Sequence, residues 1–234
     1  MTITVLFWCN MKYENIVKGT FIERPNRFIA ICEIDGQKEI CHVKNTGRCR
    51  ELLQKGVTVY LEKSSNPNRK TQYDLVSVQK NDRLINMDSQ IPNYVVAESL
   101  NKLFNDIKLF KQEYKYGNSR FDIYVETDTE KIFVEVKGVT LENDGIVRFP
   151  DAPTERGIKH LKELQKAIKD GYRACVVFLI QMNNVKYFEP NYETHPEFAK
   201  ELKKAYENGV EIYAFDSVVA PYEIKMNNKV IIRI

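Results

Sequence analysis

The sequence has little cysteine and no long apolar run. Its five cysteines are odd in number and form no C-x-x-C pair, which argues against both a zinc site and a disulfide framework. Reduced thiols in a cytoplasmic protein are the expectation that fits these residues. No stretch reaches the ~18 apolar residues that a membrane-spanning helix needs, so no membrane association is expected.

A strong charge of either sign is also absent. The net charge is +3 over 234 residues, which is too small to establish a nucleic-acid partner. The excess of basic residues lies early in the chain, where residues 11–90 carry 14 Lys and Arg against 10 Asp and Glu. Residues 2–9 are apolar but lack the basic segment and the length of a signal peptide. We therefore expect residues 1–10 to be a leader, with disorder as one option, before a more natural start at Met11.

Residues 14–88 follow an all-β pattern. Turn residues separate the apolar stretches, and Asp35-Gly36 is a strong hairpin signal. A set of short strands of this kind suits a small closed barrel such as an OB-fold, which commonly binds single strands, although an SH3-like barrel fits the composition equally well. The five predicted strands are residues 16–23, 27–35, 38–43, 57–63 and 73–80.

Alternating aliphatic and polar residues predict a β-hairpin over residues 120–137. A polar four-residue loop fits between its two strands. If Glu126 pairs with Lys131, the same register places Asp122 opposite Glu135, on the face opposite the aliphatic one.

Two carboxylates directly opposed on one face lie about 4.5–5.5 Å apart at their Cβ atoms. Such a pair needs a cation between its members or a raised pKa on one of them. The same register would place Arg120 opposite Lys137. The alternative is an exposed charged face, on which Asp122, Glu135 and Lys137 are solvated.

The remainder of the chain predicts an α/β sheet, because strands and helices alternate along it. Residues 172–181 form a continuous apolar run that is typical of a central strand buried on both faces. Asp151 or Thr154 could cap a helix that Gly171 ends. The other predicted elements are a helix over 93–104, a strand over 107–116, a helix over 196–208, a strand over 210–215 and a hairpin over 222–234 that turns at Asn227-Asn228.

Asp122, Glu135 and Lys137 resemble the PD-(D/E)xK motif of metal-dependent nucleases. Further segments, in order and spread over roughly residues 11–220, resemble the sugar fermentation stimulation protein A (SfsA) family. The resemblance implies DNA binding and a mixed α/β fold, in which an N-terminal OB-like β-barrel precedes a C-terminal PD-(D/E)xK nuclease-like domain with a mixed central sheet. We therefore expect the barrel in residues 11–88 and the nuclease-like domain in residues 89–234. The matching segments are residues 23–28, 45–47, 65–70, 116–122, 134–141, 149–152 and 156–161.

The resemblance also assigns roles at the hairpin. Asp122 and Glu135 would hold Mg²⁺ or Mn²⁺, and Lys137 would orient the attacking water and stabilise charge at phosphorus. Glu98 is a candidate third ligand, since nuclease-like folds often carry an acidic residue on the helix before the sheet; a solvent-facing glutamate is the alternative. His160 could be a base or a phosphate donor, although a packed or surface histidine explains it more simply.

Basic residues in the predicted loops are candidates for nucleic-acid contact, because cations beside free backbone N–H groups suit phosphates. Ordinary solvated loops are the alternative. The function indicated is a DNA-binding protein with a metal site that cleaves phosphodiesters, and the alternative is a catalytically silent DNA-binding regulator of sugar metabolism genes. DNA is the expected partner, non-specific binding is one option, and the oligomeric state is left open. The candidate contacts are Arg24, Arg27, Lys44, Asn45, Arg48, Arg69, Lys70 and Arg120.

Overall fold

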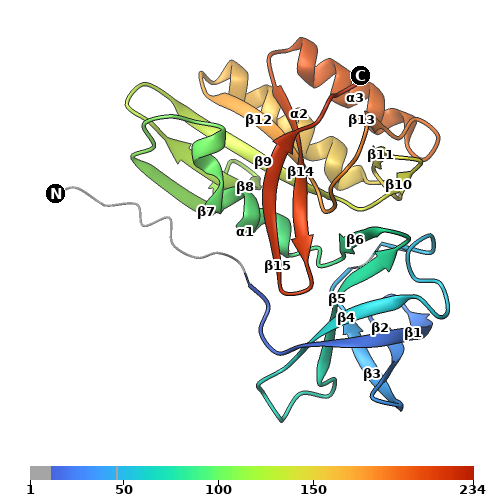
Figure 1. Cartoon of the computed structure of the whole chain (residues 1–234). Helices are drawn as coiled ribbons and strands as arrows, with labels where there is room; N and C mark the ends of the chain where they lie inside the picture. Colours follow the sequence, from blue (N-terminus) through green and yellow to red (C-terminus); the bar gives the residue numbers. More distant parts are fainter. Residues whose placement is uncertain (1–11, 46) are drawn as a thin grey trace.

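Two units, a β-barrel and a mixed α/β domain, make up the chain in a computed structural model that describes residues 12–45 and 47–234 (Figure 1). The predicted leader, residues 1–10, lies outside the described residues. None of the helices in the described ranges is long and apolar enough to cross a membrane.

The barrel closes through a parallel pair between β3 and β5. Without that pair the strands form an open sheet in the order β3-β2-β1-β4-β5-β6. The five predicted strands are present, and the OB-like barrel is confirmed. Asp35 and Gly36 both have positive φ, 51° and 78°, as a two-residue type I′ hairpin turn requires. The strands are β1 (Ile16–Asn26), β2 (Ile29–Ile34), β3 (Gln37–Val43), β4 (Thr58–Lys63), β5 (Tyr73–Lys80) and β6 (Arg83–Asn86), the last of which the sequence pattern did not predict.

A six-stranded mixed sheet forms the centre of the α/β domain, in the order β15-β14-β12-β9-β8-β7. Strands β9, β12 and β14 are parallel and the outer pairs are antiparallel. The mixed fold predicted from the sequence is therefore confirmed. The strands are β7 (Leu109–Tyr116), β8 (Ser119–Glu126), β9 (Lys131–Val139), β12 (Arg173–Ile180), β14 (Glu211–Ala220) and β15 (Glu223–Lys229), and a smaller sheet contains β10 (Glu142–Asn143), β11 (Ile146–Phe149) and β13 (Tyr187–Pro190).

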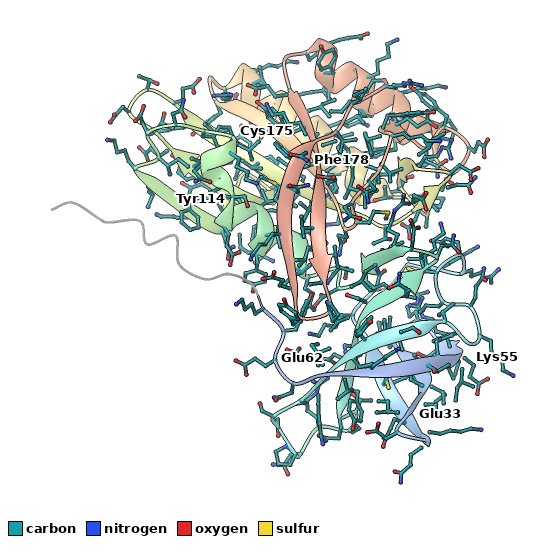
Figure 2. The ribbon with its side chains drawn as sticks, viewed as in Figure 1. Glu33, Lys55, Glu62, Tyr114, Cys175 and Phe178 are labelled. Atoms are coloured by element: carbon teal, nitrogen blue, oxygen red, sulfur yellow. The ribbon has the colours of Figure 1, made fainter. Side chains whose placement is uncertain are left out.

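Helices cover both faces of the central sheet. The helices α2 (Glu155–Lys169) and α3 (Pro196–Glu207) pack in the apolar cluster that contains Phe178, while α1 (Ile91–Glu98) packs in the cluster that contains Cys175. Figure 2 labels both of these β12 residues within the α/β domain. They are fully buried, so the apolar run does form a strand covered on both faces.

The ends of two predicted elements differ from the structure. The predicted helix over 93–104 ends at Glu98, because 3₁₀ bonding takes over after Ser99 in a short turn, η1 (Leu100–Lys102). The C-terminal hairpin turns at Pro221 and Tyr222 instead of Asn227-Asn228. Proline has no N–H to donate to a strand ladder, so it stops β14.

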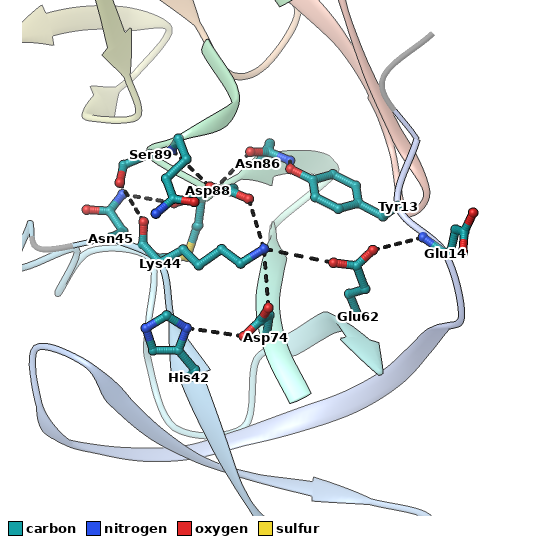
Figure 3. A network of polar contacts seen from close by, with 12 residues as sticks. Tyr13, Glu14, His42, Lys44, Asn45, Glu62, Asp74, Asn86, Asp88 and Ser89 are labelled. Atoms are coloured by element: carbon teal, nitrogen blue, oxygen red, sulfur yellow. Dashed lines mark hydrogen bonds and ion pairs between the residues drawn. The ribbon is translucent and has the colours of Figure 1, made fainter. Parts of the chain in front are cut away.

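Polar contacts join the barrel to the α/β domain. The side-chain amide of Gln181, just after β12, donates to the backbone carbonyls of Asn86 and Asp88 at 3.2 and 2.9 Å. The Asn86 amide in turn donates to the hydroxyl of Tyr13 (Figure 3). All four side chains are buried, so the contacts fix the segment from which α1 starts.

Candidate metal site and nucleic-acid interface

The hairpin register is confirmed from Glu126–Lys131 to Ile123–Val134. The β8–β9 ladder ends at Ile123, so it does not include the predicted pair of Asp122 with Glu135. The Asp122 carboxylate accepts a hydrogen bond of 2.8 Å from the backbone N–H of Val136, a bond that a strand partner would otherwise make. The Asp122 carboxylate therefore contacts β9 at Val136, between Glu135 and Lys137.

The β8–β9 ladder does not extend to the predicted pair of Arg120 with Lys137. Arg120 pairs with Lys115 of β7, and its guanidinium forms an exposed ion pair of 2.7 Å with Glu113. The predicted contact of Arg120 with phosphate stays a prediction.

Asp122 is held by α1 as well as by β9. The side-chain amide of Asn93 donates to Oδ1 at 2.9 Å. Burial raises the pKa of Asp122, and the charge of Glu135 raises it further. The ionised form of Asp122 is therefore disfavoured until a positive charge compensates the pair.

Glu135 is almost fully buried, with 1% of its side chain exposed. Its Oε1 accepts a hydrogen bond of 2.5 Å from Lys137 Nζ and another from Nδ1 of His160. Burial alone would raise the pKa of Glu135, but the Lys137 ammonium and the His160 hydrogen bond outweigh it and hold the pKa below its usual range. The other oxygen, Oε2, is buried and has no hydrogen-bond partner.

The donor set fits a divalent cation. A buried carboxylate oxygen without a partner is costly, and a hard cation that takes carboxylate oxygens would satisfy Oε2 of Glu135 while compensating Asp122. Among the residues described, no group of three or more His, Cys, Asp or Glu side chains is arranged to hold a metal. Glu98 stands at the last position of α1, five residues beyond the Asn93 that reaches Asp122, and its role as a ligand stays a prediction.

Two contacts of the site were not predicted from the sequence. One is the hydrogen bond of Asn93 to Asp122, and the other is the hydrogen bond of His160 to Glu135. The signal for His160 was its position on α2, where it shares the buried face with Gly157, Leu161 and Leu164. Thr154, one of the two predicted caps, caps this helix by accepting a hydrogen bond from the N–H of Gly157 at 3.0 Å. A polar residue on such a face needs a partner, and Glu135 provides it.

Four of the proposed nucleic-acid contacts have internal partners in the barrel. The guanidinium of Arg24 donates to the backbone carbonyls of Asn45, Gly47, Arg48 and Arg27 at 2.6–2.9 Å. It therefore joins two loops of the barrel. The buried Asn45 side chain donates to the carbonyl of Met87 at 3.0 Å.

Lys44 and Arg69 balance a cluster of carboxylates, and Figure 3 shows the contacts of Lys44. The ammonium of Lys44 lies 3.2 Å from Asp74 and 3.5 Å from Asp88. Arg69 donates to both oxygens of Asp74 at 2.6 and 3.0 Å. These two cations therefore already have internal charge partners, and their predicted contact with nucleic acid is untested.

Exposed arginines gather beside Arg24. Arg27, Arg48 and Arg50 are exposed, and with Arg24 they line a cavity of about 260 Å³. Lys70 is also exposed, in the loop before β5. Arg27 and Arg48 are thus the predicted contacts that the fold brings together on one accessible surface, here called the arginine cavity.

Comparison with known proteins matches both units. Two family models match, one described as the "SfsA N-terminal OB domain" at residues 22–87 and one as the "Sugar fermentation stimulation protein RE domain" at residues 90–223. A sugar fermentation stimulation protein homolog of Clostridium beijerinckii is 61% identical over 94% of this chain and 98% of its own length. One from Ruminiclostridium cellulolyticum is 58% identical over 96% and 100%. The structure of Pyrococcus furiosus SfsA in complex with Ca²⁺ is similar with a TM-score of 0.86, at 29% identity over 97% of this chain and 100% of that one.

Proposed function

This chain belongs to the sugar fermentation stimulation protein family, and from that premise we propose that it binds DNA and cleaves phosphodiesters with a divalent cation. Asp122 and Glu135 would hold Mg²⁺ or Mn²⁺, and Lys137 would act beside them. DNA would bind at the arginine cavity. The buried thiols described on the barrel and sheet agree with a cytoplasmic location.

One observation carries the proposal: Oε2 of Glu135 is buried without a partner beside a carboxyl, Asp122, whose pKa is raised. In a structural role both oxygens of a buried carboxylate would be satisfied. The Ca²⁺ in the Pyrococcus furiosus relative supports a divalent-cation site in this fold.

The residues divide the chemistry between them. A bound divalent cation would supply Lewis-acid polarisation of the scissile phosphate. Asn93 and the Val136 N–H hold both oxygens of Asp122, so this carboxylate is fixed before any substrate arrives. The Lys137 ammonium lies next to Glu135, where it would orient the attacking water and stabilise negative charge developing at phosphorus.

The arginine cavity supports DNA binding. Arg24 is held by backbone carbonyls, and it fixes the loops that carry Arg27 and Arg48. Their guanidinium groups would contact phosphates, which gives affinity without base recognition. Binding of this kind is non-specific.

A second candidate function is a DNA-binding regulator of sugar metabolism genes that keeps the nuclease scaffold without cleavage. The observation in its favour is that the Lys137 ammonium and the His160 hydrogen bond already stabilise the ionised Glu135. In addition, no three-ligand cluster occurs within the described ranges. Such a protein would bind DNA equally well with and without a divalent cation.

Cleavage of DNA by the purified protein, with Mn²⁺ and then with EDTA, tests the proposal. We expect Mn²⁺-dependent cleavage that is lost in Asp122→Asn and in Glu135→Gln. Asp128→Asn is the matched control, because it removes a carboxylate from the loop of the same hairpin, where the side chain is 66% exposed. Equal cleavage by the wild type and all three variants would show that the active site is not on the hairpin. DNA binding without cleavage would favour the DNA-binding regulator.

A further inference from the structure

A chain of hydrogen bonds leads from the surface of α2 to Glu135. The exposed Arg156 donates from Nε to Nε2 of His160 at 3.3 Å. His160 is buried, with 8% of its side chain exposed, and its Nδ1 contacts Oε1 of Glu135. The two α2 residues are four apart and therefore lie on neighbouring turns of one face.

The donor inventory fixes the tautomer of His160. The Nε of arginine always carries a hydrogen and cannot accept a bond. Nε2 of His160 must therefore be the acceptor, so the single hydrogen of a neutral imidazole is on Nδ1. That hydrogen points at Oε1 of Glu135, which makes His160 a donor to the carboxylate.

This arrangement has a consequence for the other carboxylate oxygen. With Oε1 occupied by Lys137 and His160, the carboxylate cannot turn without losing both bonds. Oε2 is thereby left buried and unpartnered. Residues that hold a metal ligand in place through a hydrogen bond commonly raise metal affinity by about 10–100-fold.

We propose that Arg156 and His160 are positioning residues, which hold Glu135 so that Oε2 is presented to a divalent cation. Arg156 holds the His160 ring through Nε2, and His160 sets the orientation of the carboxylate. The proposal rests on the metal site put forward above. It adds residues from α2, outside the hairpin, to that site.

The first test is the tautomer, which does not depend on metal or cleavage. ¹⁵N NMR of the His160 ring would be recorded without metal near pH 8. We expect hydrogen on Nδ1 in the wild type, in Lys159→Met and in Arg156→Met, because the Glu135 carboxylate still accepts from Nδ1 in all three. The chemical shift of Nε2 should change only in Arg156→Met, which removes the donor to Nε2. Both substitutions remove one cation from α2, but Lys159 contacts Glu163 and not His160. Hydrogen on Nε2 in the wild type would overturn the relay.

The second test is Mn²⁺ affinity by calorimetry. We expect His160→Phe to weaken Mn²⁺ binding about 10–100-fold, while His160→Asn, whose amide nitrogen can still donate to Glu135, retains most of the affinity. A purely structural histidine would give no such rescue. Equal Mn²⁺ binding by wild type, His160→Phe and Arg156→Met overturns the inference. A wild type that binds no Mn²⁺ overturns the proposed metal site, whatever the tautomer.

Discussion

Glu142 joins the two units of the protein, and its removal should destabilise both. It lies on β10 of the α/β domain with 5% of its side chain exposed. Two barrel cations contact it: Lys80 of β5 at 2.7 Å and Arg83 of β6 at 2.8 Å. The backbone N–H of Gly145 donates to the same carboxylate at 2.5 Å.

The expected magnitude follows from the pKa of Glu142. Burial acts to raise it, but the Lys80, Gly145 and Arg83 hydrogen bonds outweigh burial and lower the pKa from 4.5 to about 2. One pKa unit corresponds to about 1.4 kcal/mol, so the ionised carboxylate contributes about 3 kcal/mol to the free energy of unfolding at neutral pH. A lowered native pKa gives stability that is complete above the unfolded pKa and is lost as the pH falls toward 2. By this linkage about 2 kcal/mol disappears between pH 7 and pH 3.

Urea unfolding of the wild type and Glu142→Gln at pH 7, 5 and 3 measures this contribution. We expect the variant to be less stable by about 2–3 kcal/mol at pH 7 and by about 1 kcal/mol at pH 3. The exposed pair of Asp128 with Lys108 is the control, and Asp128→Asn should change stability by about 0.5 kcal/mol or less. A difference between wild type and Glu142→Gln that stays constant from pH 7 to pH 3 would refute the assignment of the stabilisation to the ionised carboxylate.

Two further predictions concern the barrel. Lys44→Met should lower the free energy of unfolding by about 3 kcal/mol, because Asp88 and Asp74 lose a shared cation inside the protein; an unchanged urea midpoint would contradict this. Arg48→Ala should weaken DNA binding and reduce the slope of log K against log salt by about 1, as measured by fluorescence anisotropy. Lys203→Ala on α3 is the matched control, and an equal change in slope for both variants would exclude the arginine cavity.

Local patterns were sufficient to predict much of the fold. Alternation of aliphatic and polar residues determined the hairpin register at Glu126–Lys131, because a slip of one residue would expose the aliphatic face. The apolar run of β12 was also correctly predicted for local reasons, and one of the two predicted caps of α2, Thr154, is the cap in the structure. The closed barrel followed from the number and length of its strands.

Features that depend on contacts between distant residues could not be predicted in this way. The end of the β8–β9 ladder at Ile123 coincides with a side chain, Asp122, accepting the backbone N–H of Val136. The contact of Lys80 with Glu142 spans 62 residues. Likewise, the sequence around His160 indicated only that this residue lies on the buried face of α2. Nothing in that local sequence identified Glu135 as its partner.

Anomalous scattering from a crystal soaked in Mn²⁺ would show whether a divalent cation binds at Asp122 and Glu135. We expect one strong peak in contact with Oε2 of Glu135 and with the Asp122 carboxylate, and no such peak in crystals of Glu135→Gln. A peak elsewhere that persists in Glu135→Gln, or no peak in a fully soaked crystal, would show that the cation does not bind at these two carboxylates.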